Sequence, residues 1–308
     1  MGVGEAILDL ERGLPGIRLR DLLLPGSVSN LRNLQESKVE IAENLFAQWD
    51  AATNCGSNVK AESEQEIEIK TLVSDLKNPA LLRIFLERLV TFLESIQIGD
   101  RGTLIEKLKA TRSVFEGAQG VLLDRDSGFF PYVTPSNTTF ANADEILKPF
   151  AGEVFRIGIV RGYMTRHGAG PLVTEIDSSL HMNLKDEHNL EGAWQGSLRV
   201  GWFDAVAIRH AIRTAGGPNY LDGIAVTNLD RLPADSKFCA AYDTPTERIR
   251  DLPDASGPAI TDFLTQVQPV CELVHPTELM ARIKEELEAN IILTSNGSGP
   301  EHKTFSTD

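Results

Sequence analysis

Two patterns of hydrophobic and polar positions divide the chain. In "VEIAENLFAQW" and "LLRIFLERLVTFLESI", apolar residues recur at i, i+3, i+4 and i+7, with charged residues on the opposite face. This spacing is typical of amphipathic helices and predicts a helical subregion at about residues 34–110. Residues 1–34 are rich in Gly, Leu and Pro, with turn signals at "GLPG" and "LPGS". They predict a loop-rich surface segment.

After Ser113 short apolar runs alternate with amphipathic stretches. The amphipathic stretches are Trp202–Ala215 and His275–Asn290, and the runs are "SVFEG", "EVFRIGIVRGY", "GIAVTNL", "KFCAAY" and "NIILT". Strands that alternate with helices predict an α/β fold, with a mostly parallel sheet flanked by helices. In such sheets ligands bind in the loops at the carboxyl ends of the strands. We therefore expect one domain over residues 1–308, with its site in the glycine-rich exit loops "EGAQG", "RGYMTRHGAGP", "TNLDRL" and "TSNGSGPEH".

Composition narrows the range of partners. The 308 residues are 42% hydrophobic and 24% charged, which allows a sizeable core. A net charge of −14 disfavours nucleic acid and acidic membranes, and no run of 18 apolar residues predicts a membrane span. Cys55, Cys239 and Cys271 lack CxxC spacing, which argues against a disulfide framework and a zinc site. With no signal-peptide pattern, these features fit a reducing cytoplasm.

The stretch "FEGAQGVLLDRDSGFFPYVTPSNTT", residues 115–139, concentrates glycines, hydroxyls and amides. Gln119 carries both donor and acceptor groups, which suits the edge of a neutral base, although a tight structural turn explains the glycines equally well. The hydroxyls of "YVTPSNTT" could hold phosphate oxygens, or could serve as ordinary turn and cap residues.

Two further loops carry charged groups. In "TRHGAGPLVTE", Arg166 could hold a carboxylate or phosphate, although a solvated arginine is the commoner outcome. In "TNLD", the carboxylate of Asp230 could accept two hydrogens from the edge of guanine. The ordinary alternative for Asp230 is a cap on the following turn.

Taken in order, five motifs resemble those of the adenylosuccinate synthetase family, ligases that join IMP and L-aspartate at the expense of GTP in purine biosynthesis. The motifs are "FEGAQGVLLDRDSGFFPYVTPSNTT", "GYMTRHGAGPLVTE", "RVGWFDAV", "VTNLD" and "SGPEHKT". The resemblance covers nearly the whole chain, weakly over residues 34–110. It implies a P-loop-NTPase-like fold, a cytoplasmic homodimer, and Mg²⁺ as cofactor.

The resemblance also implies roles for individual residues. Gln119 would bind the base of IMP, Leu123 would pack against that base, and Thr134 would hold the 5′-phosphate. His167 lies in the loop that follows the ribose, where the family has valine. The residues implied for GTP are Asn228, Asp230, Ser298, Gly299 and Pro300.

Two departures from the family pattern bear on substrate choice. Asn228 replaces a lysine of the guanine-binding motif, which leaves an adenine nucleotide open as donor. In the aspartate-binding loop "AWQGSLRVGW", Ser197 replaces the first arginine and only Arg199 is kept. With one arginine, we expect L-aspartate to bind more weakly or the amine substrate to differ, and Trp194 and Gln195 would suit a less charged one. The alternative is that Arg166 or another residue compensates.

The family's N-terminal "GDEGKGK" loop and a downstream histidine, which supply its acid–base and Mg²⁺ groups, have no counterpart here. We therefore assign no catalytic residue or Mg²⁺ ligand in this chain, and expect it to be truncated relative to the family, with an unpaired sheet edge. We expect little turnover by the isolated chain. The alternative is a catalytically impaired fragment or pseudoenzyme that binds a purine nucleotide or a partner subunit.

Overall fold

The structure is a computed structural model that describes residues 3–14, 16–53, 64–177, 196–254 and 257–306. The chain divides into two compact units, Met1–Thr111 and Arg112–Asp308. The expectation of one domain over 1–308 stays a prediction. In the described part of the chain, no helix is long and apolar enough to span a membrane.

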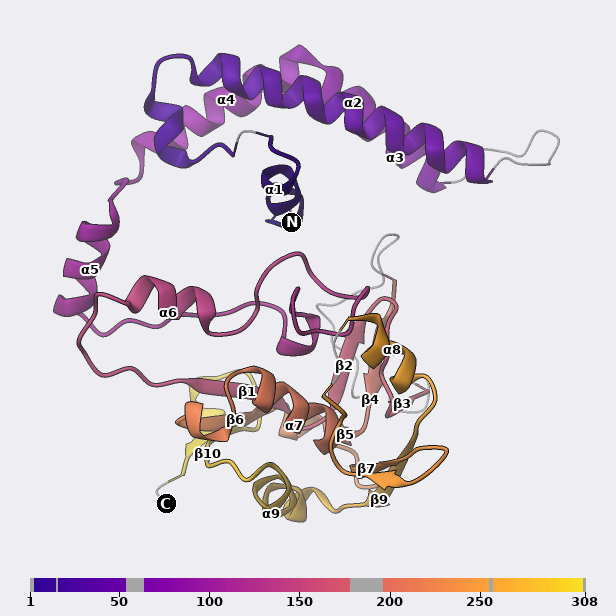
Figure 1. Ribbon diagram of the computed structural model, residues 1–308. Helices are drawn as coiled ribbons and strands as arrows, with labels where there is room; N and C mark the ends of the chain where they lie inside the picture. The colour runs from indigo at the N-terminus through magenta and orange to yellow at the C-terminus, as the bar shows by residue number, and fades with distance from the viewer. Residues whose placement is uncertain (1–2, 15, 54–63, 178–195, 255–256, 307–308) are drawn as a thin grey trace. The chain divides into compact units, whose positions relative to one another are not determined.

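The first unit is helical, as the sequence predicts for residues 34–110 (Figure 1). Its helices are α1 Val3–Glu11, α2 Ser27–Thr53, α3 Glu64–Lys77, α4 Pro79–Glu94 and α5 Arg101–Ala110, with a short 3-10 turn η1 Leu19–Leu23. The boundaries follow local capping. The Asn78 side chain accepts a hydrogen bond from the backbone of Ala80 at 3.0 Å, and that of Asp100 accepts one from Thr103 at 2.8 Å.

The interpretation of residues 1–34 as a loop-rich segment is wrong in part, because α1 and the start of α2 lie there. Gly13, Gly16, Pro25 and Gly26 lie between the two helices, whereas Gly4 lies inside α1. Asp9 of α1 is buried and pairs with Lys38 of α2, so a long-range ion pair joins the two helices. That contact is invisible in the local turn signals.

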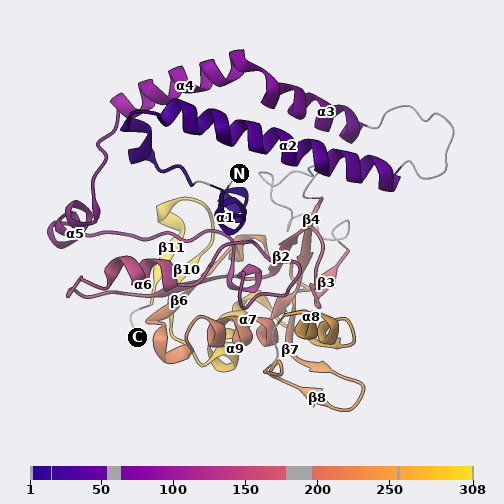
Figure 2. The ribbon, with the colours of Figure 1, turned by 45° about the horizontal axis from the view of Figure 1, so that its top comes forward.

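The second unit is built around a mostly parallel sheet, as predicted (Figure 2). Its strands run in the order β1 Ile157–Arg161, β6 Gly223–Thr227, β10 Ile291–Ser295 and β11 Lys303–Phe305. The first three are parallel and β11 is antiparallel. Strand β6 is buried over Gly223–Val226, as expected of a central strand covered on both faces. Strand β1 is at the edge of this ladder, with Ile159 74% exposed.

Two smaller sheets complete the second unit. The first has the order β2 Met164–His167, β4 Leu198–Gly201, β3 Glu175–Ile176, and is antiparallel. In the second, β7 Lys237–Asp243 pairs with β5 Phe203–Asp204, β8 Arg248–Ile249 and β9 Gln268–Leu273. The strand predicted at "SVFEG" does not form: its apolar side chains, including Val114 at 94% exposure, are left in solvent. "EGAQG" therefore does not follow a strand.

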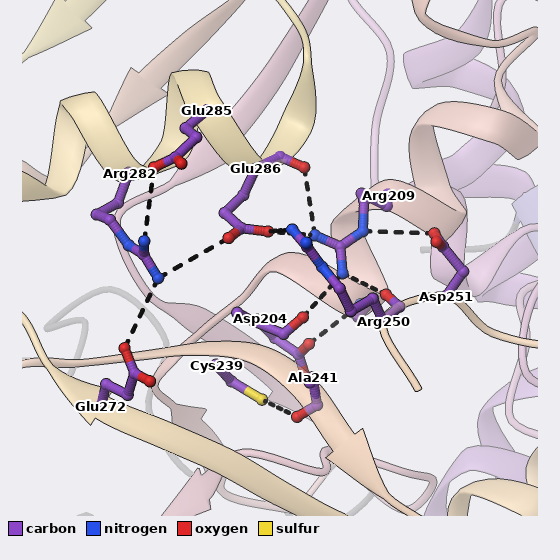
Figure 3. A network of polar contacts seen from close by, with 12 residues as sticks. Asp204, Arg209, Cys239, Ala241, Arg250, Asp251, Glu272, Arg282, Glu285 and Glu286 are labelled. Atoms are coloured by element: carbon purple, nitrogen blue, oxygen red, sulfur yellow. Dashed lines mark hydrogen bonds and ion pairs between the residues drawn. The ribbon is translucent and has the colours of Figure 1, made fainter. Parts of the chain in front are cut away.

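Helices α7 Ala205–Thr214 and α9 Pro276–Leu287 cover the parallel sheet and confirm the two amphipathic predictions. Their apolar faces share one core with β6, made by Ile208, Ile212, Ile224, Val226, Ile283 and Leu287. An ion-pair network closes the same contact at its rim, where Glu286 of α9 meets Arg209 of α7 at 3.0 Å and Arg250 (Figure 3). Two shorter helices, α6 Ala141–Leu147 and α8 Pro258–Leu264, complete the unit.

Asp204 at the start of α7 ties this helix to β7. Its carboxylate accepts hydrogen bonds from the backbone of Ala207 at 3.1 Å and from the hydroxyl of Tyr242 at 2.5 Å. Burial raises the pKa of Asp204 to about 6, and the two hydrogen bonds oppose this rise. Helix α7, which directly follows β5, is therefore anchored by buried polar contacts as well as by its apolar face.

Candidate functional site

The loop at residues 116–139, called here the nucleotide loop, is organised around one buried carboxylate, Asp124. Its Oδ1 accepts hydrogen bonds from the backbone of Asp126 at 2.9 Å and from both the backbone and hydroxyl of Ser127. Its Oδ2 accepts one from the backbone of Thr138 at 2.7 Å. Burial acts to raise the pKa of Asp124, but these hydrogen bonds outweigh it and hold the pKa below its ordinary value. Asp124 thus joins the beginning and end of the loop as an ion.

A close backbone approach at Gly128 keeps this turn tight. A Cβ atom at Gly128 would lie 2.7 Å from the carbonyl oxygen of Leu122 and 2.8 Å from the amide nitrogen of Asp124. Any larger residue would therefore push apart the chain that carries the carboxylate.

Gln119 and Thr134, predicted to hold opposite ends of a nucleotide, lie side by side in this loop. The Nε2 of Gln119 lies 3.3 Å from the hydroxyl oxygen of Thr134, which lies 3.3 Å from that of Ser136. Gln119 is exposed and has a left-handed φ of 65°, a backbone conformation that residues other than glycine seldom adopt. The two side chains are therefore brought together at the surface, with long hydrogen bonds that a ligand can replace.

Leu123 and His167 have different surroundings. Leu123 ends the 3-10 turn η2 Val121–Leu123, and its carbonyl accepts a hydrogen bond from the backbone of Thr134 at 2.8 Å. It is partly exposed beside Thr134. His167 ends β2, opposite Leu198, and its Nδ1 is buried without a hydrogen-bond partner in the described part of the chain.

Arg166 fastens the nucleotide loop to the glycine loop at 168–171. It is buried at 8% exposure, and its guanidinium donates to the carbonyls of Tyr132 at 2.8 Å and Ala169 at 3.0 Å. Gly170 has a φ of 110°, and a Cβ there would lie 2.7 Å from the Cβ of Tyr132. Burial lowers the pKa of Arg166, and nearby Arg199 adds to this effect. Arg166 is therefore buried rather than solvated, and its Nε and Nη2 hold this link.

Arg199, predicted to bind aspartate, is engaged by protein groups on the neighbouring strand and loop. Its guanidinium forms a two-pronged ion pair with Glu175, including a 2.7 Å bond from Nε. Its Nη1 donates to the carbonyls of Gly168 at 3.0 Å and Gly170 at 2.8 Å. Hydrogen bonding with Glu175 raises the pKa of Arg199 and lowers that of Glu175. Trp194 and Gln195, the other predicted contacts for an amine, lie outside the described residues.

The residues predicted to read the donor purine lie at one edge of the parallel sheet. Asn228 and Asp230 follow β6, while Ser298, Gly299 and Pro300 follow β10. Since β6 and β10 are parallel neighbours, their carboxyl ends meet at the same edge. Asp230 lies exposed in the 3-10 turn η5 Leu229–Arg231, and Ser298 and Pro300 are exposed as well.

Asn228 has a left-handed conformation, φ 59° and ψ 31°, and its side-chain oxygen accepts a hydrogen bond from the hydroxyl of Thr227 at 3.0 Å. Asparagine tolerates this conformation better than most residues. The replacement of the family's lysine therefore has a local structural rationale, whatever nucleotide is bound.

Sequence reasoning missed the two carboxylates that organise the site, Asp124 and Glu175. In the sequence they are acidic residues of "GVLLDRDSG" and "PLVTE", with no role assigned to them. The Asp-x-x-Ser spacing of Asp124 and Ser127 is a signal for a local side-chain to backbone turn, and could have identified the first. The pairing of Glu175 with Arg199 depends on the register of β3 against β4, which no local pattern reveals.

Comparison with known proteins identifies the family. A sequence profile of the adenylosuccinate synthetase family matches residues 15–288. The structure is similar to that of a fully ligated adenylosuccinate synthetase from Plasmodium falciparum, with a TM-score of 0.67 and 19% identity. That match covers 99% of this chain and 69% of the Plasmodium chain, and it shows a shared fold.

A second similar structure is the succinoaminodeoxyadenylate synthetase of cyanophage S-2L, bound to dGMP and dATP as an energy donor. It has a TM-score of 0.47 and 17% identity, over 70% of this chain and 53% of the phage chain. The family profile and the Plasmodium structure, taken together, give the fold as that of a purine nucleotide ligase. The chain belongs to the adenylosuccinate synthetase family.

Proposed function

We propose that this chain provides the IMP-binding part of an adenylosuccinate synthetase-type ligase, which joins IMP and L-aspartate with hydrolysis of GTP in AMP biosynthesis. The observation that carries the proposal is the contact of Gln119 with Thr134 inside a loop braced by Asp124. These are the two residues to which the resemblance gives the base and the phosphate of one nucleotide. Their position in one loop supports a shared ligand, although the two side chains would separate to reach the base and the phosphate, which lie at opposite ends of IMP.

The chemistry of the two side chains suits the two ends of IMP. The amide of Gln119 can donate and accept at the edge of the hypoxanthine ring. The hydroxyl of Thr134 can donate to a phosphate oxygen, and the partly exposed side chain of Leu123 supplies an apolar surface for the base. The long contacts of Gln119 and Thr134 would be exchanged for shorter ones, of which the bond from Thr134 to the phosphate is charge-assisted.

In the reaction of this family, the 6-oxygen of IMP is phosphorylated and the amine then displaces phosphate at C6. The residues of this chain would hold and orient the nucleotide through these steps. Mg²⁺ would neutralise charge on the phosphates when bound. We assign it no ligand here, because among the described residues no three His, Cys, Asp or Glu side chains gather in a way that could hold a metal ion.

At the sheet edge, Asp230 would accept hydrogen bonds from guanine, with the loop of Ser298, Gly299 and Pro300 beside it. The parallel pairing of β6 with β10 supports a common role for the two loops. GTP as the donor, a homodimer in the cytoplasm and the L-aspartate substrate are all parts of the proposal that come from the family resemblance.

A second candidate is a ligase of the same class with a different amine substrate. It is favoured by the engagement of Arg199, whose guanidinium already holds Glu175 and two carbonyls. A dicarboxylate would have to displace Glu175 to pair with this arginine. An amine with fewer negative charges would not.

The test is calorimetric titration of the purified full chain with IMP and with inosine, which lacks the phosphate. We expect IMP to bind more tightly than inosine, and Thr134→Ala to remove most of that advantage. Gln119→Ala should weaken both ligands by about tenfold, the loss of a hydrogen bond worth about 1.4 kcal/mol.

Thr246→Ala, in the exposed turn between β7 and β8, is the matched control and should change neither affinity. Equal binding of IMP and inosine by the unmodified chain would contradict the proposal. So would an IMP affinity that Thr134→Ala leaves unchanged.

A further inference from the structure

Two cysteines far apart in the sequence lie directly opposite each other in the structure. Cys239 of β7 pairs with Cys271 of β9 in an antiparallel ladder. Directly opposed residues in such ladders have Cα atoms about 4.5–5.5 Å apart. Disulfides span Cα separations of about 4.4–6.8 Å. The backbone thus places the pair within the range that a disulfide requires.

The two thiols also contact each other. The side chains of Cys239 and Cys271 are hydrogen-bond partners, and the Sγ of Cys239 lies 3.2 Å from the carbonyl oxygen of Ala241. Both thiols are free. Cys239 is fully buried, whereas Cys271 is partly exposed, so reagents in solution can reach the second cysteine first.

The ladder is irregular beside the pair. The register shifts between Cys239 and Ala241, so that Ala240 is an extra residue in β7. Such a bulge bends the strand and gives the adjoining side chains a different direction from those of a regular ladder. The bulge lies next to Cys239, whose sulfur must move closer to that of Cys271 for a disulfide to form.

We infer that Cys239 and Cys271 form a redox-active dithiol, which closes to a cross-strand disulfide by exchange with a low-molecular-weight disulfide such as oxidised glutathione. The thiolate of Cys271 attacks the reagent, forms a mixed disulfide and releases one glutathione thiolate. The thiolate of Cys239 then attacks the Cys271 sulfur and releases the second. In sum, two cysteine thiols are oxidised and one glutathione disulfide is reduced to two thiols.

The local electrostatics support this order of events. The hydrogen bond with Cys239 lowers the pKa of Cys271, although burial opposes the effect. The same hydrogen bond, followed by burial, raises the pKa of Cys239. Because the thiolate is the attacking species, the partly exposed cysteine is also the more readily ionised one.

The site is separate from the nucleotide loop in sequence but shares a core with it. Cys239 belongs to the same apolar cluster as Phe129, which lies in that loop. The disulfide would join strands that already pair, so we expect oxidation to preserve the fold.

The test uses the full chain, reduced and then incubated at neutral pH in buffers of increasing ratio of oxidised to reduced glutathione. Free thiols are then alkylated, and the protein is analysed by intact mass and peptide mapping. We expect a species that has lost two hydrogen atoms and two alkylation sites, with the peptides of Cys239 and Cys271 linked. No variant is needed for this measurement, so it does not depend on whether a variant folds.

Three variants separate the steps. Cys271→Ser should remove the reaction, Cys239→Ala should stop it at a mixed disulfide of Cys271 with glutathione, and Cys55→Ser should leave it intact. Three alkylatable thiols in the unmodified chain, under buffers that oxidise free dithiothreitol, would overturn the inference. A link that involves Cys55 would overturn it as well.

Discussion

Two regions are predicted to bind nucleotides, and they differ in structure: the nucleotide loop, and the sheet edge after β6 and β10 that is predicted to read the donor purine, called here the donor edge. In the nucleotide loop, a buried carboxylate holds four donors, and Arg166 ties the loop to its neighbour. At the donor edge, Asp230, Ser298 and Pro300 are exposed on turns that follow β6 and β10. The nucleotide loop keeps the family's motif, and residues of that motif also hold the loop's own fold together. The edge, where Asn228 departs from the motif, can change without breaking a buried contact.

The largest expected effect is that of Asp124→Asn. The amide has a single oxygen and no charge, so the four donors that Asp124 holds lose their charged partner. We expect the free energy of unfolding to fall by about 1.5–3 kcal/mol, the range for a hydrogen bond to a charged group. Urea titration followed by circular dichroism measures it. The control is Asp126→Asn, which changes an exposed neighbouring residue. Equal losses of unfolding free energy in the two variants would refute the claim that Asp124 holds the loop together.

The contribution of Asp124 should also depend on pH. Its pKa in the folded chain is below the ordinary value of 3.8, so its stabilisation is present above that value and is lost as pH falls through the lower one. The difference in unfolding free energy between the unmodified chain and Asp124→Asn should therefore shrink below about pH 4. A difference that is constant between neutral and acidic pH would contradict the assignment.

A smaller loss is expected from Arg166→Met, which keeps the apolar stem and removes the donors to Tyr132 and Ala169. Two part-buried hydrogen bonds from a charged donor to backbone carbonyls are lost, which costs about 1–3 kcal/mol. The IMP affinity should fall with the unfolding free energy, because the two loops are no longer fastened. Arg248→Met, an exposed arginine paired with Asp243, should change neither quantity measurably.

The smallest effect on stability is expected at the donor edge. Asp230→Asn should change the unfolding free energy by less than about 0.5 kcal/mol, as is usual for exposed positions. If Asp230 reads guanine, the same change should abolish any preference of the chain for GTP over ATP, measured by competition against a fluorescent nucleotide. If the variant still prefers GTP over ATP, another residue recognises the purine. If it loses much of its stability, the donor edge depends on buried contacts as the nucleotide loop does.

The sequence was sufficient for the elements whose pattern is local. The amphipathic helices α7 and α9 follow from the spacing of apolar residues, and the buried strand β6 follows from its apolar run "GIAVTNL". The prediction is wrong at "SVFEG", where apolar composition predicts a strand but residues 113–117 form none, and Val114 stays exposed. A strand forms only where another strand pairs with it, and that pairing is decided by residues outside the segment's own pattern.

The same limit applies to the site. Gln119 and Thr134 could be named from a motif, but the fold of the loop that brings them into contact could not. Asp124 holds that loop by a bond to Thr138, 14 positions away. The pairing of Arg199 with Glu175 and of Cys239 with Cys271 depends on strand register. Register is set by the whole sheet and cannot be read from the spacing of cysteines or charges along the chain.

The most direct test of the central claim, that the nucleotide loop is a preformed IMP site, is a crystal structure of the chain with IMP. The account predicts the 5′-phosphate within hydrogen-bonding distance of the Thr134 hydroxyl, and the hypoxanthine edge against the Gln119 amide, with the Asp124 contacts unchanged. IMP bound at another place, or a phosphate that does not contact Thr134, would contradict it.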